Sequence, residues 1–162
     1  MCIRIIITGG TFDKYYDEIK GELTFRDTHL PSILRRARVT LPIEVELNQL
    51  VDSLYMTHDN RLRILAACEA APEKHLIVIH GTDTMVETAQ VLGEAGLAKT
   101  IVLTGAMIPY AVTGSDSLFN LGCSVSAAQL LPEGVYIAMN GRIFPWHDVR
   151  KNREHGVFET LS

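Results

Sequence analysis

Short apolar runs that end in glycine- and threonine-rich turns restrict the fold of this chain more than any other feature. Three such runs are "CIRIII" (2–7), "HLIVIH" (75–80) and "KTIVLTG" (99–105). The turns at their ends are "TGGT" (8–11), "HGTDT" (80–84) and "TGAM" (104–107). Runs of this length, rich in β-branched residues and closed by turn residues, predict buried strands.

Helical patterns separate these predicted strands. We expect helices at about 29–38, with Pro31 in the first turn, and at about 59–71, 84–95 and 115–130. Two of them carry an apolar stripe at 3- and 4-residue spacing. The predicted stripes are Met85, Ala89, Leu92 and Gly93, and then Leu118, Leu121, Gly122 and Val125.

The remaining segments vary more in pattern. "IEVELNQL" (43–50) alternates apolar and polar residues, which predicts a strand with one covered face. Residues 12–27 read as an excursion or a small hairpin. "GVYIAMN" (134–140) leads into "GRIF" (141–144), which suggests a further hairpin, and a polar tail follows.

Strands that alternate with helices predict parallel β-α units with right-handed crossovers. We therefore expect residues 1–162 to form a single α/β domain, a three-layer α/β/α sandwich with a mainly parallel, Rossmann/flavodoxin-like sheet. Ligands of such sheets bind outside the carboxyl ends of the strands. The three turns, joined by "VDSLYM" (51–56), should meet at that edge.

Composition excludes several classes of function. The formal net charge is −4, and "LRRAR" (34–38) is the only dense basic patch, which argues against a nucleic-acid partner. No apolar run approaches the ~20 residues of a membrane span. Cys2, Cys68 and Cys123 are odd in number and lack C-x-x-C spacing, so we expect neither disulfides nor a zinc site, and a cytoplasmic location.

The turns themselves suggest an anion or oxyanion site. Glycines let a backbone approach a ligand, and helix N-termini offer free N–H groups. The turns lack the glycine spacing of dinucleotide and phosphate-binding loops. Thr11 and Thr82 place hydroxyls at two strand ends, but a threonine nucleophile needs a base. We interpret His80 as a packed strand-end residue; a desolvated lysine could serve instead, and spacing alone leaves open which one.

Helix capping accounts for part of "HGTDT". Thr84 and Glu87 have the spacing of a capping box, and Asp83 would favour the helix dipole. Capping leaves Thr82 unexplained and Asp83 only partly explained.

Taken together, the motifs resemble those of the bacterial-type L-asparaginase/glutaminase family, specifically its N-terminal domain. The matching segments are "TGGT" (8–11), "HGTDT" (80–84), "TGAMIP" (104–109), "SDSLFNL" (115–121) and "HDVRKN" (147–152). Their order and spacing agree over almost the whole chain, and "TGGT" followed by "HGTDT" at this distance is highly specific.

The resemblance implies an amidohydrolase that converts a side-chain amide, such as that of asparagine, to the acid and ammonia. It implies Thr11 as nucleophile on a mobile loop, and Thr82, Asp83 and Lys151 as a relay. Ser53 resembles a serine that holds the substrate α-carboxylate, and Asp83 would also meet the α-ammonium. The backbones of Gly10 and Gly81 would border the pocket. Neither a metal nor an organic cofactor is implied.

Two departures from the family pattern leave a second class of function open. Family members carry a smaller C-terminal domain, whereas this sequence stops at Ser162, and Glu154 and Glu159 read as exposed tail carboxylates. The face that this domain normally covers would then favour a homodimer.

The second departure lies in the residues that would contact the substrate. The family's loop tyrosine has no clear match; Tyr15 and Tyr16 are candidates, with loop packing as the alternative. Leu54 and Tyr55 replace polar contacts after Ser53. The alternative to an enzyme is a binding module for an amino acid or small anion that keeps the pocket without turnover.

Overall fold

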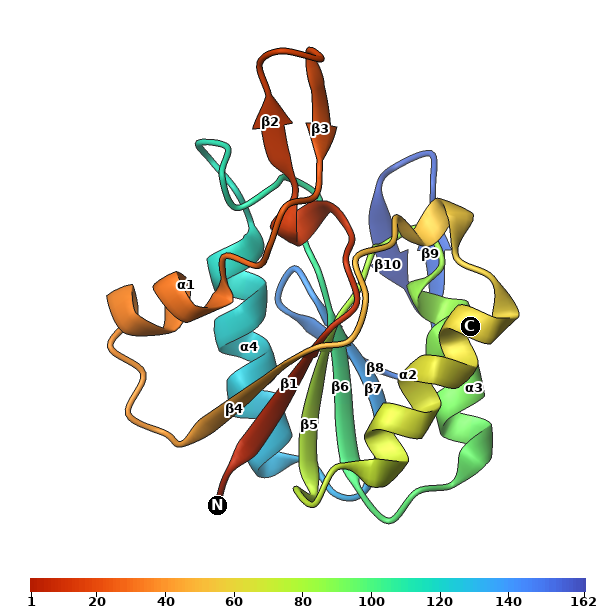
Figure 1. Ribbon diagram of the computed structural model, residues 1–162. Helices are drawn as coiled ribbons and strands as arrows, with labels where there is room; N and C mark the ends of the chain where they lie inside the picture. The colour runs from red at the N-terminus through yellow and green to blue at the C-terminus, as the bar shows by residue number, and fades with distance from the viewer.

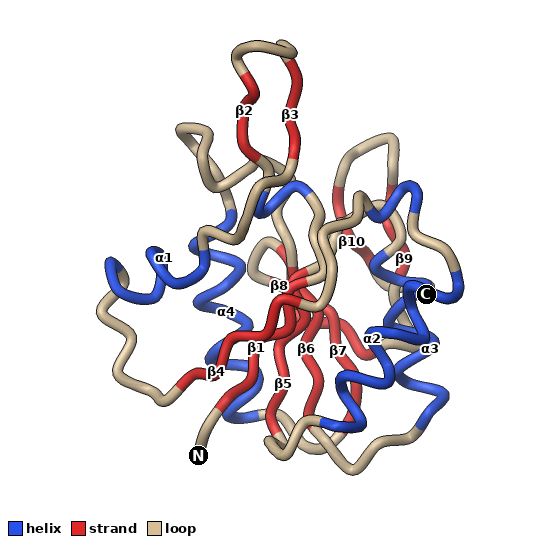
Figure 2. The backbone as a smooth tube through the Cα atoms, viewed as in Figure 1, coloured by secondary structure: helices blue, strands red, loops and turns tan.

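The computed structural model describes residues 1–162 and is built on a six-stranded sheet in the order β4-β1-β5-β6-β7-β8 (Figures 1 and 2). The strands are β1 (Ile3–Ile7), β4 (Ile43–Leu47), β5 (His75–Ile79), β6 (Thr100–Thr104), β7 (Gly134–Met139) and β8 (Arg142–Pro145). All neighbours are parallel except β7 and β8. The five parallel strands therefore follow the flavodoxin-like order, with the switch point between β1 and β5.

Helices cover both faces of this sheet. α1 (Leu30–Arg36) and α4 (Ser117–Leu130) lie on one side, and α2 (His58–Ala70) and α3 (Met85–Ala95) on the other (Figure 1). The predicted three-layer α/β/α architecture and all four predicted helices are confirmed. No helix has the length and hydropathy needed to cross a bilayer.

Two hydrophobic cores sit between the layers, because the central strands are apolar on both faces. Ile3, Ile5 and Ile7 of β1 face α1 and α4, whereas Ile6 faces α2 and α3. All four side chains are fully buried. Alternation along one strand thus anchors both helix layers.

Two small hairpins and two 3-10 turns stand at the carboxyl edge of the sheet. They are β2–β3 (Tyr15–Asp17, Glu22–Thr24), β9–β10 (Arg150–Asn152, Val157–Glu159), η1 (Thr11–Asp13) and η2 (Ser53–Tyr55). The hairpin expected within 12–27 and the β7–β8 hairpin are both present. The polar-tail prediction was wrong, because Phe158 is buried in the core and the segment folds into β9–β10. Glu159 is likewise not a free tail carboxylate, since it pairs with Arg150 at 2.9 Å.

The prediction of one covered face on residues 43–50 was also wrong. Val45 and Leu47 are 36% and 50% exposed, while Glu46 is partly buried. β4 is an edge strand with a single neighbour, and Arg4 of β1 draws Glu46 inward through an ion pair of 3.3 Å.

The two predicted helix stripes differ in outcome. In α3, Met85, Ala89 and Leu92 are fully buried, as predicted. In α4, Leu121 is buried and Val125 packs against the same core, as predicted, but Leu118 is 52% exposed, and the buried side of the helix also carries Asn120 and Ser124. Hydrogen bonds made by Asn120 explain why polar side chains are buried on this helix.

The Asn120 side chain hydrogen-bonds to backbone groups in the segments that follow β6 and β7. It donates to the Gly105 carbonyl at 2.9 Å, and its side-chain oxygen accepts from the Asn140 N–H at 3.0 Å. Of the predicted α4 stripe, Leu118 and Gly122 are therefore exposed, whereas Leu121 and Val125 pack on the core.

Candidate active site

The predicted turns meet at the switch point between β1 and β5. Gly10, with φ 88°, lies directly against the backbone of Gly81, and a Cβ there would collide with it. Gly81 in turn lies against the Ser53 side chain, and Gly105 lies against the carbonyl of His80. Close approach of these backbones requires glycine, so the Gly-rich turns bring four separate segments into one site.

Backbone donors are free at this junction. The N–H groups of Gly10, Thr11, Gly81 and Thr82 donate to no backbone acceptor in the chain. Converging free N–H groups form a site for an anion or for a developing oxyanion.

Lys151 connects the second turn to the β9–β10 hairpin. Its Nζ donates to Thr82 Oγ1 at 2.9 Å and to Asp83 Oδ1 at 3.0 Å. The Lys151 side chain is only 11% exposed, and Thr82 is 7% exposed. The structure thus brings together the three residues that the resemblance suggested for the relay.

The β9–β10 hairpin is what holds Lys151 in place. Lys151 pairs across the hairpin with Phe158, whose ring is buried in the core. The Arg150–Glu159 ion pair closes the other face of the same hairpin. A lysine distant in sequence therefore reaches Thr82 from a strand anchored by core packing.

Sequence reasoning missed Arg153. Its Nη1 lies 3.3 Å from Asp83 Oδ1, and its Nη2 donates to the Asp83 carbonyl at 2.7 Å. Arg153 lies in the turn directly after β9, and no local pattern in the sequence indicated that it would reach Asp83.

The Ser53 turn packs against the start of α3. The Thr84 hydroxyl donates to the Ser53 carbonyl at 2.7 Å, and Ser53 Oγ accepts from the Thr84 N–H at 3.3 Å. Thr84 does precede α3, but the predicted capping box with Glu87 was wrong, because the Thr84 side chain makes no capping hydrogen bond. Its hydroxyl serves instead to fix Ser53, which is 1% exposed.

Asp52, next to Ser53, receives the first loop. Lys14 forms an ion pair with the Asp52 carboxylate, which also accepts from the Leu54 N–H at 3.0 Å. Burial alone would raise the pKa of Asp52, but these donors hold it below its ordinary value. No local pattern in the sequence indicates this link between residues 14 and 52.

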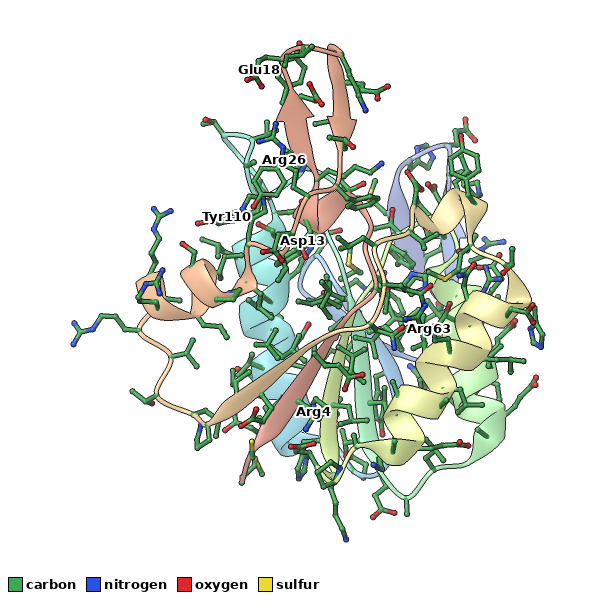
Figure 3. The ribbon with its side chains drawn as sticks, in the orientation of Figure 1. Arg4, Asp13, Glu18, Arg26, Arg63 and Tyr110 are labelled. Carbon is green, nitrogen blue, oxygen red and sulfur yellow. The ribbon has the colours of Figure 1, made fainter.

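Thr11 begins the 3-10 turn that follows Gly10. None of the hydrogen bonds at this edge uses its hydroxyl. The turn is fixed one step later by Asp13, which is fully buried at the base of the β2–β3 hairpin (Figure 3). Asp13 accepts from the Thr28 hydroxyl and the His29 N–H, both at 2.8 Å, and burial raises its pKa.

The candidate loop tyrosines take different positions. The Tyr15 ring packs on the His29 ring with centroids 4.0 Å apart, and Tyr16 is 60% exposed on β2. Neither hydroxyl hydrogen-bonds to Thr11, Thr82 or Lys151. The packing interpretation fits Tyr15, and Tyr16 faces solvent.

His80 supports the second turn from below. It is fully buried, with Nδ1 donating to the Gly81 carbonyl and Nε2 accepting from the Thr88 hydroxyl, both at 2.7 Å. Burial lowers its pKa to about 4, so the ring is neutral. This agrees with the interpretation of His80 as a packed residue. No group of three or more His, Cys, Asp and Glu side chains is arranged to hold a metal ion.

Comparison with known proteins shows that this chain is similar to L-asparaginases. An L-asparaginase of Dirofilaria immitis is 30% identical over 156 residues, which cover 91% of this chain and 26% of that protein. L-asparaginase 1 of Escherichia coli (strain K12) is 28% identical, over 95% of this chain and 48% of that protein. The chain thus spans about half of the length of the Escherichia coli protein and about a quarter of the Dirofilaria immitis protein.

Solved structures agree with the sequence relatives. The thermostable L-asparaginase from Thermococcus kodakarensis matches with a TM-score of 0.88 and 25% identity, over 99% of this chain and 51% of that one. The family model described as "Asparaginase, N-terminal" matches residues 2–159. This chain therefore belongs to the asparaginase family and corresponds to its N-terminal domain.

Proposed function

We propose that this chain hydrolyses the side-chain amide of a small substrate such as asparagine, releasing ammonia. The observation that carries the proposal is Lys151 Nζ, which bridges Thr82 Oγ1 and Asp83 Oδ1 at 2.9 and 3.0 Å. A hydroxyl held by a base candidate that is itself oriented by a carboxylate is the arrangement that activates a weak nucleophile.

In the proposed reaction, the Thr11 hydroxyl attacks the amide carbonyl carbon. Its proton passes through Thr82 to Lys151 in the neutral amine form, and a proton returned to the leaving nitrogen lets ammonia depart. Water then attacks the threonyl ester, which releases the acid and restores the Thr11 hydroxyl. Thr11 suits the nucleophile because its hydroxyl has no partner at this edge, whereas that of Thr82 is committed to Lys151.

Substrate binding in this scheme uses the backbone junction. The free N–H groups beside Gly10 and Gly81 would stabilise the oxyanion of the tetrahedral intermediate. Ser53, fixed against Thr84, would border the substrate carboxylate. The names of the relatives, L-asparaginases, support this substrate class.

The experiment is an ammonia-release screen over asparagine, glutamine and related amides. We expect turnover of at least one amide by the purified chain and its loss in Thr82→Ala, because the hydroxyl that links nucleophile and lysine is gone. Equal turnover by Thr82→Ala would refute the relay. Stabilisation by the amide with no ammonia formed would establish the binding-module alternative.

We further propose that residues 1–162 work as one domain, in the cytoplasm, and pair as a homodimer. An apolar hollow of about 660 Å³ on α4 and β8 supports the pairing. The side chains of Leu118, Phe119 and Ile143 line it and are 52%, 60% and 46% exposed. The thiols of the three cysteines are free, and a Campylobacter jejuni relative is titled a probable cytoplasmic L-asparaginase. Light scattering at micromolar concentration should give a dimer that Leu118→Glu dissociates; a wild-type monomer would refute it.

A further inference from the structure

Helix α4 differs from the other three helices in its charge. Its 14 residues, "SLFNLGCSVSAAQL" (117–130), include no charged side chain, whereas α1, α2 and α3 each carry at least one. A helix without charge on any face is normally buried on every face. One face of α4 covers the sheet, so its outward face is the one that lacks a partner.

The outward face of α4 is apolar at both ends and small in the middle. Its exposed or partly exposed side chains recur at 3- and 4-residue spacing, and they are Leu118, Phe119, Gly122, Cys123, Ser126 and Leu130. The amide of Gln129 on the same face donates to the Val125 carbonyl of its own helix at 3.0 Å. A small centre lets a second helix approach closely, because the side chains at the crossing set the distance between two helix axes.

The order of large and small side chains along this face is symmetric about residue 124. Reversing the helix about that point places Leu118 opposite Leu130 and Gly122 opposite Ser126. Large residues then meet large ones, and small residues meet small ones. A two-fold axis brings the same surface of two copies together in this reversed order, so the face is complementary to itself.

Charges beside the two ends of α4 favour the same arrangement. The basic stretch at 34–38 lies beside the N-terminal half of α4, where Arg36 and Leu118 line one hollow, and its arginines form no ion pair (Figure 1). Exposed Glu133 follows the C-terminal end and forms no ion pair either, since the amine of nearby Lys99 donates to backbone carbonyls. In a reversed pair, Glu133 of one copy approaches α1 of the other.

These charges and the apolar contact have different roles in the pair. Both the arginines of α1 and Glu133 are exposed, so solvent and salt screen them equally. The charges therefore fix the direction of pairing, and removal of apolar surface from water supplies the affinity.

We propose that the partner of this outward face is α4 of a second copy, packed antiparallel across a two-fold axis that passes close to Cys123. This inference rests on the homodimer proposed above and adds its geometry. The two Cys123 side chains then lie on either side of the axis. Two Gln129 positions, each five residues from the centre, are about 15 Å apart along the helices at 1.5 Å per residue.

Cross-linking with a bis-maleimide shorter than that span tests the geometry. In Cys2→Ser, Cys123 is the reactive thiol, because Cys68 is buried and burial raises its pKa to about 12. We expect Cys2→Ser to form a covalent dimer and Cys2→Ser/Cys123→Ser to form none. Adding Gln129→Cys to the latter moves the thiol toward the helix end, and this matched control should also form none.

A charge swap tests the orientation independently. Arg36→Glu and Glu133→Arg should each raise the dissociation constant of the dimer a few-fold, as expected of an exposed ion pair. The chain with both changes should return to within about twofold of wild type, because the pair is restored with its signs exchanged. Loss of the Arg36 hydrogen bond to Tyr110 would not be rescued in this way. Arg63→Glu, exposed on α2, is the control and should leave the constant unchanged.

The outcomes separate this geometry from the homodimer itself. A dimer in light scattering that does not cross-link through Cys123, that cross-links as well through Gln129→Cys, or that the charge swap does not restore would overturn the antiparallel α4 pair alone. A monomeric wild-type chain would overturn both proposals.

Discussion

The two halves of the candidate site are held very differently. On one side, Thr82, Asp83 and Lys151 are joined by hydrogen bonds and set against buried Ser53 and His80. On the other, Thr11 has a free hydroxyl and leads into the projecting β2–β3 hairpin, whose tip residue Ile19 is 92% exposed (Figure 1).

This difference suggests a division of labour. The relay half is assembled before any ligand arrives, as electrostatic preorganisation requires. In the Thr11 half, buried Asp13 and the Lys14–Asp52 pair hold the residues after Thr11, but the Thr11 hydroxyl itself has no hydrogen-bond partner. We therefore take the position of the Thr11 hydroxyl as the adjustable one.

The largest effect should come from breaking the relay. Lys151→Met keeps much of the side-chain volume but removes the amine, so ammonia release should fall by roughly 10²–10⁴-fold, the usual contribution of a positioned proton carrier. Arg142→Met, on β8 away from the site, is the control and should keep full activity. Activity within threefold of wild type in Lys151→Met would mean that the preassembled half is not catalytic.

A methyl group at Gly10 should break the contact between the two halves. Gly10→Ala puts a Cβ into the Gly81 backbone at a φ of 88°, and we expect a loss of about 3 kcal/mol or more in the free energy of unfolding. Gly122→Ala, at an exposed position in α4 with open space around it, should instead stabilise by about 1 kcal/mol. Urea denaturation distinguishes these opposite signs, and equal small shifts would show that the turns do not touch.

His80 should make the rigid half sensitive to acid. Its pKa is about 4 in the folded chain against an ordinary 6.5, so the unfolded chain binds more protons between these values. Stability is then complete above about pH 6.5 and falls, by about 3 kcal/mol, as the pH drops toward 4.

His80→Asn, which still offers a donor to Gly81, should show a smaller fall in stability over this range. Urea denaturation of both proteins at pH 7 and at pH 4.5 measures the difference. Identical pH dependence in the two proteins would mean that His80 titrates normally.

The smallest effect should come from the adjustable half. Lys14→Met removes the ion pair with Asp52. Because both side chains of this pair are partly exposed, the pair contributes little energy, and we expect KM to rise only a few-fold with kcat nearly unchanged. Lys20→Met, at the exposed hairpin tip, is the control. A fall in kcat as large as that of Lys151→Met would erase the proposed distinction between the halves.

The fold was largely predictable because strand and helix periodicities are local. The convergence of Gly10, Gly81 and Ser53 followed from the rule that parallel strands end at one edge. By contrast, the partners of Lys151 depended on a hairpin whose register no local pattern revealed, so only family resemblance selected this lysine.

The errors share one physical origin, because they occur where tertiary contacts override local preference. Thr84 has a capping spacing but satisfies Ser53, and α4 turns polar Asn120 toward the sheet to meet strand-end backbone groups. Phe158, in an otherwise polar tail, was the overlooked sign of a folded hairpin.

The most direct test of the central claim asks which threonine becomes acylated. Turnover of an amide is quenched in acid, the chain is digested, and mass spectrometry locates the acyl group. The account predicts the added mass on the peptide that contains Thr11. An acyl group on the peptide that contains Thr82, or on neither peptide while ammonia is being released, would contradict it.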